Sequence, residues 1–591
     1  MAVARVADRR WSQWLWLCGL FVSLLGFVFA GGVGIATGQC GQSMVTSFPS
    51  VVARSDAADP EPVTVRGVVT GTFTGRDQLN GFFLQQMHDA YPRGLFVYAP
   101  SLPEHWNTLV RPGNALEVDG RPAQWRGQAQ LADVDAVRHC GTPGKPSPQI
   151  VEWPADAARL SEFRNLLITV PQPLTVTGSW DLERFGSLDL AAERLQRTRS
   201  GIVDDNAVTL ILDDGRYQRF PNPVPYLDPA TGTRRVGDRV AGLRGVLVEQ
   251  FDAWRVHPTQ APVFTVDNPR PPPPERSTDT VRIAAFNLEN HFITVGARGA
   301  ADTEQLAAQR AKLLAAIAAL DADLLGLIEL ENHPAALESL LSHINTLEIG
   351  TYRAVPVGYE TGSDAIRLAW IYREDRLEPA APAVSDSAGV HHRPPLMAIM
   401  QPVGGGRPLL AALVHFKSKG RCPRSGDIDR GDGCWNQRRE AQASALLAAV
   451  DRERPESAAV VLMGDFNAYR DEPPLEALRA AGYVGAIDAF VPPERRYTFV
   501  FRGVSGMLDH AFVDSRLERK VVDAGIWHVN ADEPALLGYR GNSTWALANR
   551  GTPWRSSDHD PIFLDLRWTG STAVAHQPLE ELHHAASDYR H

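Results

Sequence analysis

Four consecutive prolines in "DNPRPPPPERS", residues 267–277, divide this chain of 591 residues into two unlike parts. Proline fixes its own φ and has no backbone N–H, so such a run cannot form a helix interior or a central strand. It favours a stiff, extended linker instead. Short strand-like runs with turns precede it, and alternating strand-like and helix-like runs follow it. The chain is also too long for one core, and we expect about two to four domains.

The part before the linker predicts two small β-barrel-like modules. Residues 39–150 contain five strand-like runs, among them "VTVRGVVTGTF" and "GLFVYAP", separated by Gly, Pro and Asn. A looser copy follows at residues 151–266. There "RVGDRVAGLRGVLVEQFDAWRV" (235–256) repeats the order of "RPGNALEVDGRPAQWRGQAQL" (111–131). Each stretch has a basic residue and a glycine, then a strand, a turn and a second strand.

The N-terminal segment predicts export. Arg5, Arg9 and Arg10 precede an uncharged run from Trp14 to Ala36. Residues 1–38 are therefore a signal peptide or, if they are not cleaved, a membrane anchor. We expect a secreted protein, with a periplasmic or membrane-anchored form as the alternative.

Four cysteines beyond this segment agree with an oxidising compartment. Cys40–Cys140 and Cys422–Cys434 are the simplest of the three possible pairings. Free thiols or a metal site are the alternatives, although the C-x2-4-C spacing usual for zinc is absent. The net charge of −10 argues against a protein that holds nucleic acid by bulk charge. It leaves open an enzyme that meets phosphate through a metal ion and local arginines.

After the linker, apolar runs repeatedly end in a residue that can bind metal or move a proton. In "VRIAAFNLEN", period-two alternation puts Asn287 and Glu289 on one strand face. Any single Asn or Asp at such a place is usually a turn-former. The collection is different, because burying this many polar groups unpaired is costly. The other runs deliver Glu329 ("DADLLGLIELEN"), His415 ("LLAALVHFKSKG"), Asp465 and Asn467 ("VVLMGDFNAYRDEPP"), Asp509 ("GMLDHAFVD"), and Asp558 and His559 ("SSDHDPIFLDL").

The order of "FNLEN", "LIELEN", "HFKSK", "GDFNAYRDEPP", "LDHAFV" and "SDHDPI" resembles the endonuclease/exonuclease/phosphatase superfamily over about residues 278–570. With the export signal, the β-modules and "GCWNQRREAQA", the chain is most similar to secreted bacterial extracellular nucleases. The resemblance implies a four-layer α/β sandwich with the site at the strand ends. It also implies that the first β-module is an OB fold, which would bind oligonucleotides through Phe82, Phe83, Phe96 and Tyr98. For strand positions, however, the alternative that these aromatics form the barrel core is favoured.

The resemblance also implies residue roles. Glu329, with Asn287, Glu289 and Asp558, would hold a divalent cation, and oxygen ligands favour Mg²⁺, Ca²⁺ or Mn²⁺. Asp465 and Asn467 would hold the attacking water and a phosphate oxygen. His559 would accept a proton and be oriented by Asp509, while Asp560 would be a turn residue. His415 matches a histidine of the deoxyribonuclease branch and would protonate the leaving 3′ oxygen.

Three further residues are candidates for substrate contact: Lys417, Asn436 and Arg439. The last two lie on one face of a predicted helix after Cys434, for which a solvated helix is the alternative. Asp364 is a further candidate for lining the site. The C-terminal residues 571–591 are expected to be a disordered tail.

Together these features predict a secreted, metal-dependent endonuclease that cuts DNA, with RNA as a further candidate substrate and little sequence preference. A phosphomonoesterase or a sphingomyelinase-like lipid phosphodiesterase of the same fold is the second hypothesis. An inactive surface-binding protein is the third. No obligate protein partner is inferred, and membrane contact is expected only through an uncleaved N-terminus. Removal of residues 39–270 is expected to spare the chemistry.

Overall fold

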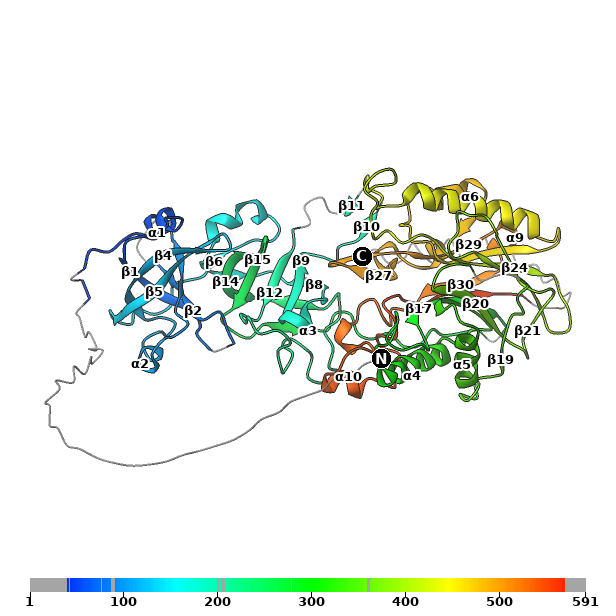
Figure 1. Ribbon diagram of the computed structural model, residues 1–591, viewed down its shortest axis with the longest axis horizontal. Helices are drawn as coiled ribbons and strands as arrows, with labels where there is room; N and C mark the ends of the chain where they lie inside the picture. Colours follow the sequence, from blue (N-terminus) through cyan, green and yellow to red (C-terminus); the bar gives the residue numbers. More distant parts are fainter. Residues whose placement is uncertain are drawn as a thin grey trace, which may run out of the picture.

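A computed structural model describes residues 40–568 apart from 42, 76, 87–90, 199–200, 203–207, 278 and 359–361. The predicted signal or anchor segment and the predicted C-terminal tail lie outside the described residues. Two β-modules and an α/β domain follow one another along the long axis of the molecule (Figure 1). Among the described residues, no helix combines the length and apolar character needed to cross a membrane.

Module 1 is a closed five-stranded barrel with strand order β1-β2-β3-β5-β4, in which β3 and β5 are parallel. Phe82 and Phe83 are fully buried and Phe96 is 2% exposed, so these aromatics belong to the core rather than to a binding face. The favoured alternative, that the aromatics form the barrel core, is confirmed for these three, whereas Tyr98 is half-buried. Helices α1 (Phe48–Arg54) and α2 (Glu104–Asn107) accompany β1 (Val63–Phe73), β2 (Gly81–Gln85), β3 (Gly94–Tyr98), β4 (Ala115–Trp125) and β5 (Gln128–His139).

Module 2 repeats this connectivity with interrupted strands. The pair β12–β15 is parallel, as β3–β5 is in module 1. The consecutive strands β7 and β8 pair with β14 and β13, which are also consecutive, so the β7–β14 and β8–β13 pairs near opposite ends of the sheet are linked through the chain. The strands of this sheet are β6 (Gln149–Ile150), β7 (Leu167–Val170), β8 (Leu174–Gly178), β9 (Ser187–Ala191), β12 (Leu210–Asp213), β13 (Arg239–Ala241), β14 (Leu243–Gln250), β15 (Ala253–Pro258) and β16 (Val263–Thr265).

Smaller elements complete module 2. Strands β10 (Arg197–Thr198) and β11 (Gly201–Ile202) form a separate two-stranded ribbon. The helix α3 (Leu182–Phe185) and the 3-10 helix η1 (Ala157–Phe163) lie in connections between strands. The disulfide Cys40–Cys140 confirms the predicted pairing and joins the start of module 1 to the end of its last strand.

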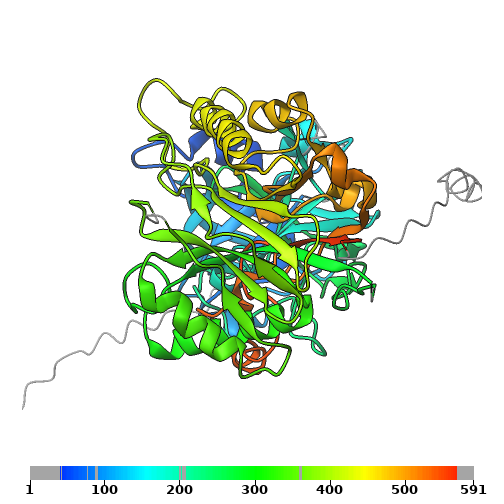
Figure 2. The same cartoon turned by 90° about the vertical axis from the view of Figure 1, so that its right-hand side faces the viewer.

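The C-terminal domain contains two stacked sheets with helices on both outer faces (Figure 2). One sheet has the order β19 (Tyr352–Ala354), β20 (Ile366–Arg373), β18 (Leu324–Glu331), β17 (Val281–His291), β31 (Ile562–Leu566) and β30 (Val521–Ile526). The other has the order β21 (Leu377–Pro379), β23 (Leu396–Pro402), β24 (Leu409–His415), β25 (Ala459–Asp465), β29 (Asp509–Val513) and β26 (Val484–Gly485), with β22 (Val384–Ser385) paired to β23.

Alternating apolar residues build three layers of core. Ile283 and Ala285 of β17 point between the sheets toward Leu413 and Met463. The intervening Ala284 and Phe286 face the outer helices. The helices α4 (Thr303–Leu320) and α5 (Pro334–Ile344) cover the first sheet, and α6 (Asn436–Glu453) and α7 (Pro473–Ala480) cover the second. The alternation of strands and helices predicted after the linker is confirmed.

Short elements connect these layers. They are α8 (Ile487–Phe490), η2 (Pro493–Arg495), the hairpin β27 (Phe499–Phe501) and β28 (Val504–Gly506), α9 (Ser515–Glu518), η3 (Ala535–Leu537) and α10 (Thr544–Ala548). The second disulfide, Cys422–Cys434, confirms the other predicted pairing and closes the loop before α6.

Module 2 and the linker pack directly against the C-terminal domain. Leu536 and Leu537 of that domain are buried in the core of module 2, and Ser505 N donates to Leu195 O. The linker residues 267–277 have no helix or strand, as predicted, but Asn268 and Arg270 form side-chain hydrogen bonds with Asp532 and Glu533. The linker is therefore an anchored segment rather than a free spacer.

Candidate active site

Asp465, the last residue of β25, is the centre of a buried polar cluster. Its Oδ2 accepts a hydrogen bond from Asn287 Nδ2 at 3.3 Å and lies 3.5 Å from His415 Nε2. Its Oδ1 accepts from the backbone N–H of Asn467 at 2.8 Å. The ends of β17, β24 and β25 therefore bring together four residues that the sequence predicted. Their convergence follows from the strand order, because β17 and β24 lie in facing sheets.

His559 and Asp509 form the second part of the cluster. His559 Nδ1 lies 2.7 Å from Asp509 Oδ2, and both side chains are buried. Asp509 is paired with Asp465 in the β25–β29 register, so the two acids lie side by side. Burial alone would lower the pKa of His559, but Asp509, Asp558 and Asp465 together raise it well above its usual value. The imidazole is therefore held as a cation by the surrounding carboxylates.

Three further polar residues of the cluster have an unusual backbone conformation that sets the direction of their side chains. Glu289 has φ +52°, Glu329 has φ +64° and Asn467 has φ +47°, all in the left-handed region that such residues rarely adopt. The pairing of β17 with β18 shifts register between Asn287 and His291, where Glu289 lies. Glu329 Oε2 accepts from Asn290 N at 2.9 Å, which ties the two bulges together. Bulges and strained residues of this kind gather at functional sites.

Three acids of the cluster have raised pKa values. Burial, and then repulsion from Asp558, raises the pKa of Glu289 to about 8. Burial, and then repulsion from Asp509, raises the pKa of Asp465 to about 7. Burial and Asp558 also raise the pKa of Glu329. A divalent cation would relieve this repulsion, and carboxylate and amide oxygens are the ligands that hard cations prefer.

A compact group of potential ligand atoms lies in this cluster, but it consists of other residues than the predicted cation ligands Asn287, Glu289, Glu329 and Asp558, whose role stays a prediction. Asp465, Asp509 and His559 each place a ligand atom within 4.8 Å of the others. Glu289, Glu329 and Asp558 surround this group electrostatically. A second compact group, Cys40, Glu117 and Cys140, is no candidate because its cysteines form a disulfide.

His415 is buried and neutral. Burial, and then the charge of Arg393, lowers its pKa well below the usual value. Its Nε2 lies 3.9 Å from Glu329 Oε1, and its Nδ1 has no hydrogen-bond partner. In this state the ring carries no extra proton to give to a leaving group. A neutral imidazole can donate or accept a hydrogen bond, and the expected role of His415 as proton donor to the leaving 3′ oxygen stays a prediction.

Arg393 was missed by the sequence analysis. It is buried and donates to His415 O at 3.3 Å and to Phe416 O, and it lies 3.8 Å from Asp364. Arg298 binds the same carboxylate at 3.4 Å. The candidate Asp364 therefore joins two arginines beside the cluster. Arg393 lies in "HHRPP", which follows no long apolar run, so the pattern that marked the other residues was absent.

The three residues predicted to contact substrate lie in different environments. Lys417 is half-buried, and its Nζ lies 5.1 Å from the centre of the Trp435 ring. Asn436 is half-buried and bonded to Asp432 and Arg439. Arg439 is fully buried and donates to the carbonyls of Cys434, Lys417 and Asp432. It supports the loop and cannot reach substrate, so that prediction is wrong, and its helix face is not solvated either.

The two aspartates beside His559 differ in environment. Asp558 is half-buried and raises the pKa values of Glu289 and Glu329, which places it on the acid side of the cluster. Asp560 is buried and accepts from the backbone N–H groups of Asn530 and Ala531. It holds a neighbouring loop in place.

The C-terminal domain is a four-layer α/β sandwich, and clustered acids, an amide and a histidine lie at its strand ends, where they could carry hydrolytic chemistry. Residues 284–559 match the model of the Endonuclease/Exonuclease/phosphatase family. The match lies within the C-terminal domain and does not extend into the two β-modules.

Several solved structures are similar to about half of the chain. The human Nocturnin catalytic domain with bound sulfate has 17% identity and a TM-score of 0.33, covering 50% of this chain and 97% of that one. TDP2 of D. rerio, complexed with single strand DNA product, has 18% identity and a TM-score of 0.33, covering 48% and 98%. The mannosyl-6-phosphatase of Bacteroides thetaiotaomicron has 16% identity and a TM-score of 0.31, covering 48% and 99%. A search of curated proteins found no match.

Proposed function

We propose that this protein is a secreted, divalent-metal-dependent endonuclease that hydrolyses phosphodiester bonds of DNA, with RNA as a further substrate and little sequence preference. The observation that carries the proposal is the Asp509–His559 pair at 2.7 Å, adjacent to Asp465 and backed by Glu289 and Glu329. This set combines a histidine oriented by a carboxylate with buried acids whose charge a cation would offset.

The proposed mechanism assigns a role to each part. A divalent cation, with Mg²⁺ as the first candidate and Ca²⁺ or Mn²⁺ as alternatives, supplies charge that neutralises the scissile phosphate. Asn287, Glu289, Glu329 and Asp558 would hold it. A bound cation would offset the negative charge of the carboxylates around His559, and the histidine would then accept a proton from the attacking water. Asp465 and Asn467 orient that water, and Asp509 holds the imidazole in place.

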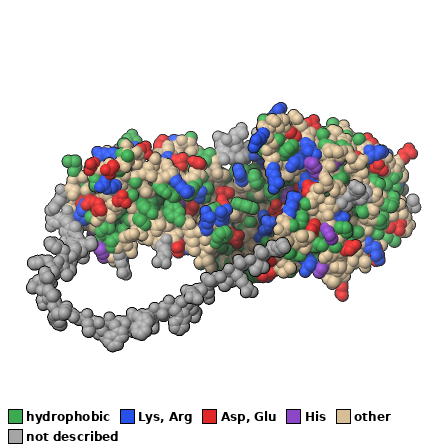
Figure 3. Space-filling model, in the orientation of Figure 1, with side chains coloured by type: hydrophobic (Ala, Val, Ile, Leu, Met, Phe, Trp, Pro, Cys, Tyr) green, Lys and Arg blue, Asp and Glu red, His purple; other side chains and the backbone are tan. Residues whose placement is uncertain are grey.

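Positively charged side chains beside His415 favour a polyanionic diester as substrate over a small monoester. Arg393 and Arg438 both lower the pKa of Lys417, after burial, so these three positive charges lie close together. Arg298 is exposed at the same place, beside Asp364. On the face shown in Figure 3, Lys and Arg side chains gather where module 2 meets the C-terminal domain. A nucleic-acid strand presents phosphates on both sides of the scissile bond, which such a surface can bind.

Two features support the proposal of an exported nuclease. Two disulfides suit an oxidising compartment. The closed barrel with strand order β1-β2-β3-β5-β4 is the reason for proposing that module 1 is an OB fold.

One experiment tests the proposal. The purified chain is incubated with plasmid DNA, RNA, sphingomyelin and a phosphomonoester, each with Mg²⁺ and with chelator. We expect nicking of plasmid DNA that requires the ion, and loss of at least about a hundredfold in His559→Ala and Asp465→Ala. The exposed His139→Ala is the matched control and should cleave normally. Turnover of lipid or monoester without DNA cleavage would replace the proposed function by the second hypothesis.

A further inference from the structure

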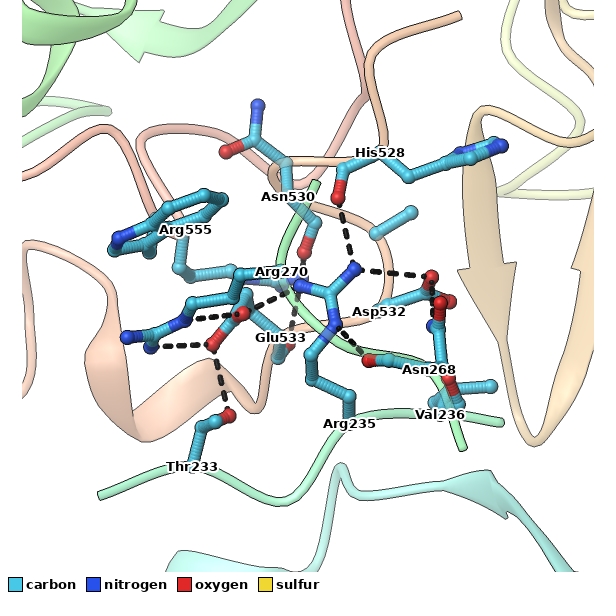
Figure 4. Close-up of polar contacts among 12 residues, drawn as sticks. Thr233, Arg235, Val236, Asn268, Arg270, His528, Asn530, Asp532, Glu533 and Arg555 are labelled. Atoms are coloured by element: carbon cyan, nitrogen blue, oxygen red, sulfur yellow. Dashed lines mark hydrogen bonds and ion pairs between the residues drawn. The ribbon is translucent and has the colours of Figure 1, made fainter. Parts of the chain in front are cut away.

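Two buried acids of the C-terminal domain face module 2 (Figure 4). Asp532 is fully buried and Glu533 is 2% exposed, and both follow β30 in the loop 527–533. Burying a carboxylate without a partner is costly, so the source of their compensating charge matters.

That charge comes from module 2 and the linker. Arg194 Nη1 lies 2.8 Å from Asp532 Oδ1, and Arg235 lies 3.3 Å from Asp532 Oδ2 and 2.5 Å from Glu533 Oε1. Arg270 donates to both oxygens of Glu533 at 2.9 Å. Arg235 also donates to His528 O at 2.9 Å, so it contacts the loop at both ends. Further hydrogen bonds to the two acids come from Asn268, Tyr497 and Thr233.

The same loop holds the segment that carries His559. Asn530 Nδ2 donates to His559 O at 2.7 Å. Asp560, the next residue, accepts from Asn530 N at 2.7 Å and from Ala531 N at 2.9 Å, and its other oxygen lies 2.9 Å from His528 Nδ1. The loop and the His559 segment are therefore one hydrogen-bonded unit.

We propose that Arg235, with Arg194 and Arg270, is a positioning residue for the hydrolytic reaction, and that module 2 is part of the catalytic unit. The arginines hold loop 527–533, and the loop holds the backbone of His559. The inference rests on the proposed function. It also opposes the expectation that residues 39–270 can be removed without loss of chemistry, because that deletion takes away all three arginines and leaves Asp532 and Glu533 unpaired.

Point variants in the full chain test this. Arg235→Met keeps an unbranched apolar stem but removes the charged guanidinium, and Arg235→Lys restores a charge without the planar fork. The matched control is Arg255→Met, because Arg255 of β15 forms an ion pair with Asp213 at 2.9 Å within module 2 and does not contact loop 527–533. Initial rates give kcat and KM, thermal melts give Tm, and amide hydrogen exchange reports on residues 527–533 and 556–560.

We expect Arg235→Met to lower kcat by about tenfold to a hundredfold with little change in KM, since small displacements of a reacting group have effects of this size. Arg235→Lys should recover part of the loss, and Arg255→Met should lower Tm without lowering kcat. Amide exchange in both segments should become faster in Arg235→Met alone. If Arg235→Met melts like Arg255→Met and keeps wild-type kcat and exchange, the proposal is overturned.

The exchange measurement does not depend on catalysis. If the wild-type chain cleaves no phosphodiester but the Arg235→Met variant still loosens residues 556–560, the proposed function fails and the coupling between module 2 and His559 stands. If cleavage is observed but exchange at 556–560 is unchanged in Arg235→Met, the coupling fails and the proposed function stands.

Discussion

His559 Nδ1 lies 2.7 Å from Asp509 Oδ2, although the two residues are 50 positions apart in the chain. The flanking Asp558 and Asp560 are nearer in sequence but serve other purposes. One adds negative charge near Glu289 and Glu329, and the other holds loop 527–533. The partner of the histidine is therefore set by strand β29.

Asp509→Asn tests this pairing. The amide can still form a hydrogen bond, but it carries no charge to stabilise an imidazolium. We expect kcat to fall by about a hundredfold to ten-thousandfold. Because Asp509 raises the pKa of His559, the pH at which activity appears should also move to lower values in the variant. Rates across a pH series measure both effects.

The control for Asp509 lies at the other end of its strand. Asp514 follows β29 and pairs with Arg454 at 3.8 Å, away from the cluster. Asp514→Asn should leave kcat and the pH profile unchanged. Equal losses in the two variants would show that a general weakening of β29, rather than the histidine contact, explains the result.

Glu329→Gln tests the proposed cation site. Removing one negative charge from the acid group should raise the Mg²⁺ concentration needed for half-maximal cleavage by about tenfold or more. The exposed Glu338→Gln on α5 should not change it. The measurement is a titration of Mg²⁺ after chelation, with cleavage rate and ion binding by calorimetry as separate readouts. An unchanged Mg²⁺ requirement would remove Glu329 from the ligand set.

Lys417 and Lys419 lie two residues apart but should behave differently. Lys417 Nζ stacks over Trp435 and is free to meet phosphate, so Lys417→Ala should raise KM and reduce the salt dependence of binding by about one unit of slope. Lys419 is bound to Asp432 O at 2.6 Å and to buried Glu472 at 2.6 Å. Lys419→Ala should instead lower Tm with little effect on the salt slope. If Lys417→Ala lowers Tm and Lys419→Ala changes KM and the salt slope instead, Lys419 is the phosphate contact and Lys417 is the structural residue.

Acid should weaken the junction with module 2. Burial alone would raise the pKa of Asp532, but Arg194 and Arg235 lower it to about 2. An unfolded aspartate has a pKa of about 3.9. The stabilisation is therefore fully present above about pH 4 and is lost as the pH falls toward 2, amounting to about 3 kcal/mol for this group.

Urea unfolding at a series of pH values measures this loss. The free energy of unfolding of the wild type should fall more steeply below about pH 4 than that of Asp532→Asn, which has no carboxylate to protonate. The exposed Asp429→Asn serves as the control and should keep the wild-type slope. Parallel curves for wild type and Asp532→Asn would contradict the contribution of this ion pair.

Much of the domain could be read from local patterns. The helix α4 and the strands β17, β18, β24 and β25 follow from their apolar periodicity, and the polar residues at the strand ends were visible as interruptions of that pattern. Arg439 shows where this reasoning fails. Its position on a helix face predicted an exposed contact, but the Cys422–Cys434 loop folds over it and uses its guanidinium internally.

By itself, the sequence determined the order of the domains, the strand and helix types after the linker, and the residues able to perform the chemistry, because these depend on residue type and short-range periodicity. Tertiary structure decided which of them meet. The choice of Asp509 for His559, the buried state of Arg439, the place of Arg393 and the contact of Arg235 with Asp532 and Glu533 all depend on sheet order and domain packing. These bring together residues up to about three hundred positions apart, where no local pattern carries a signal.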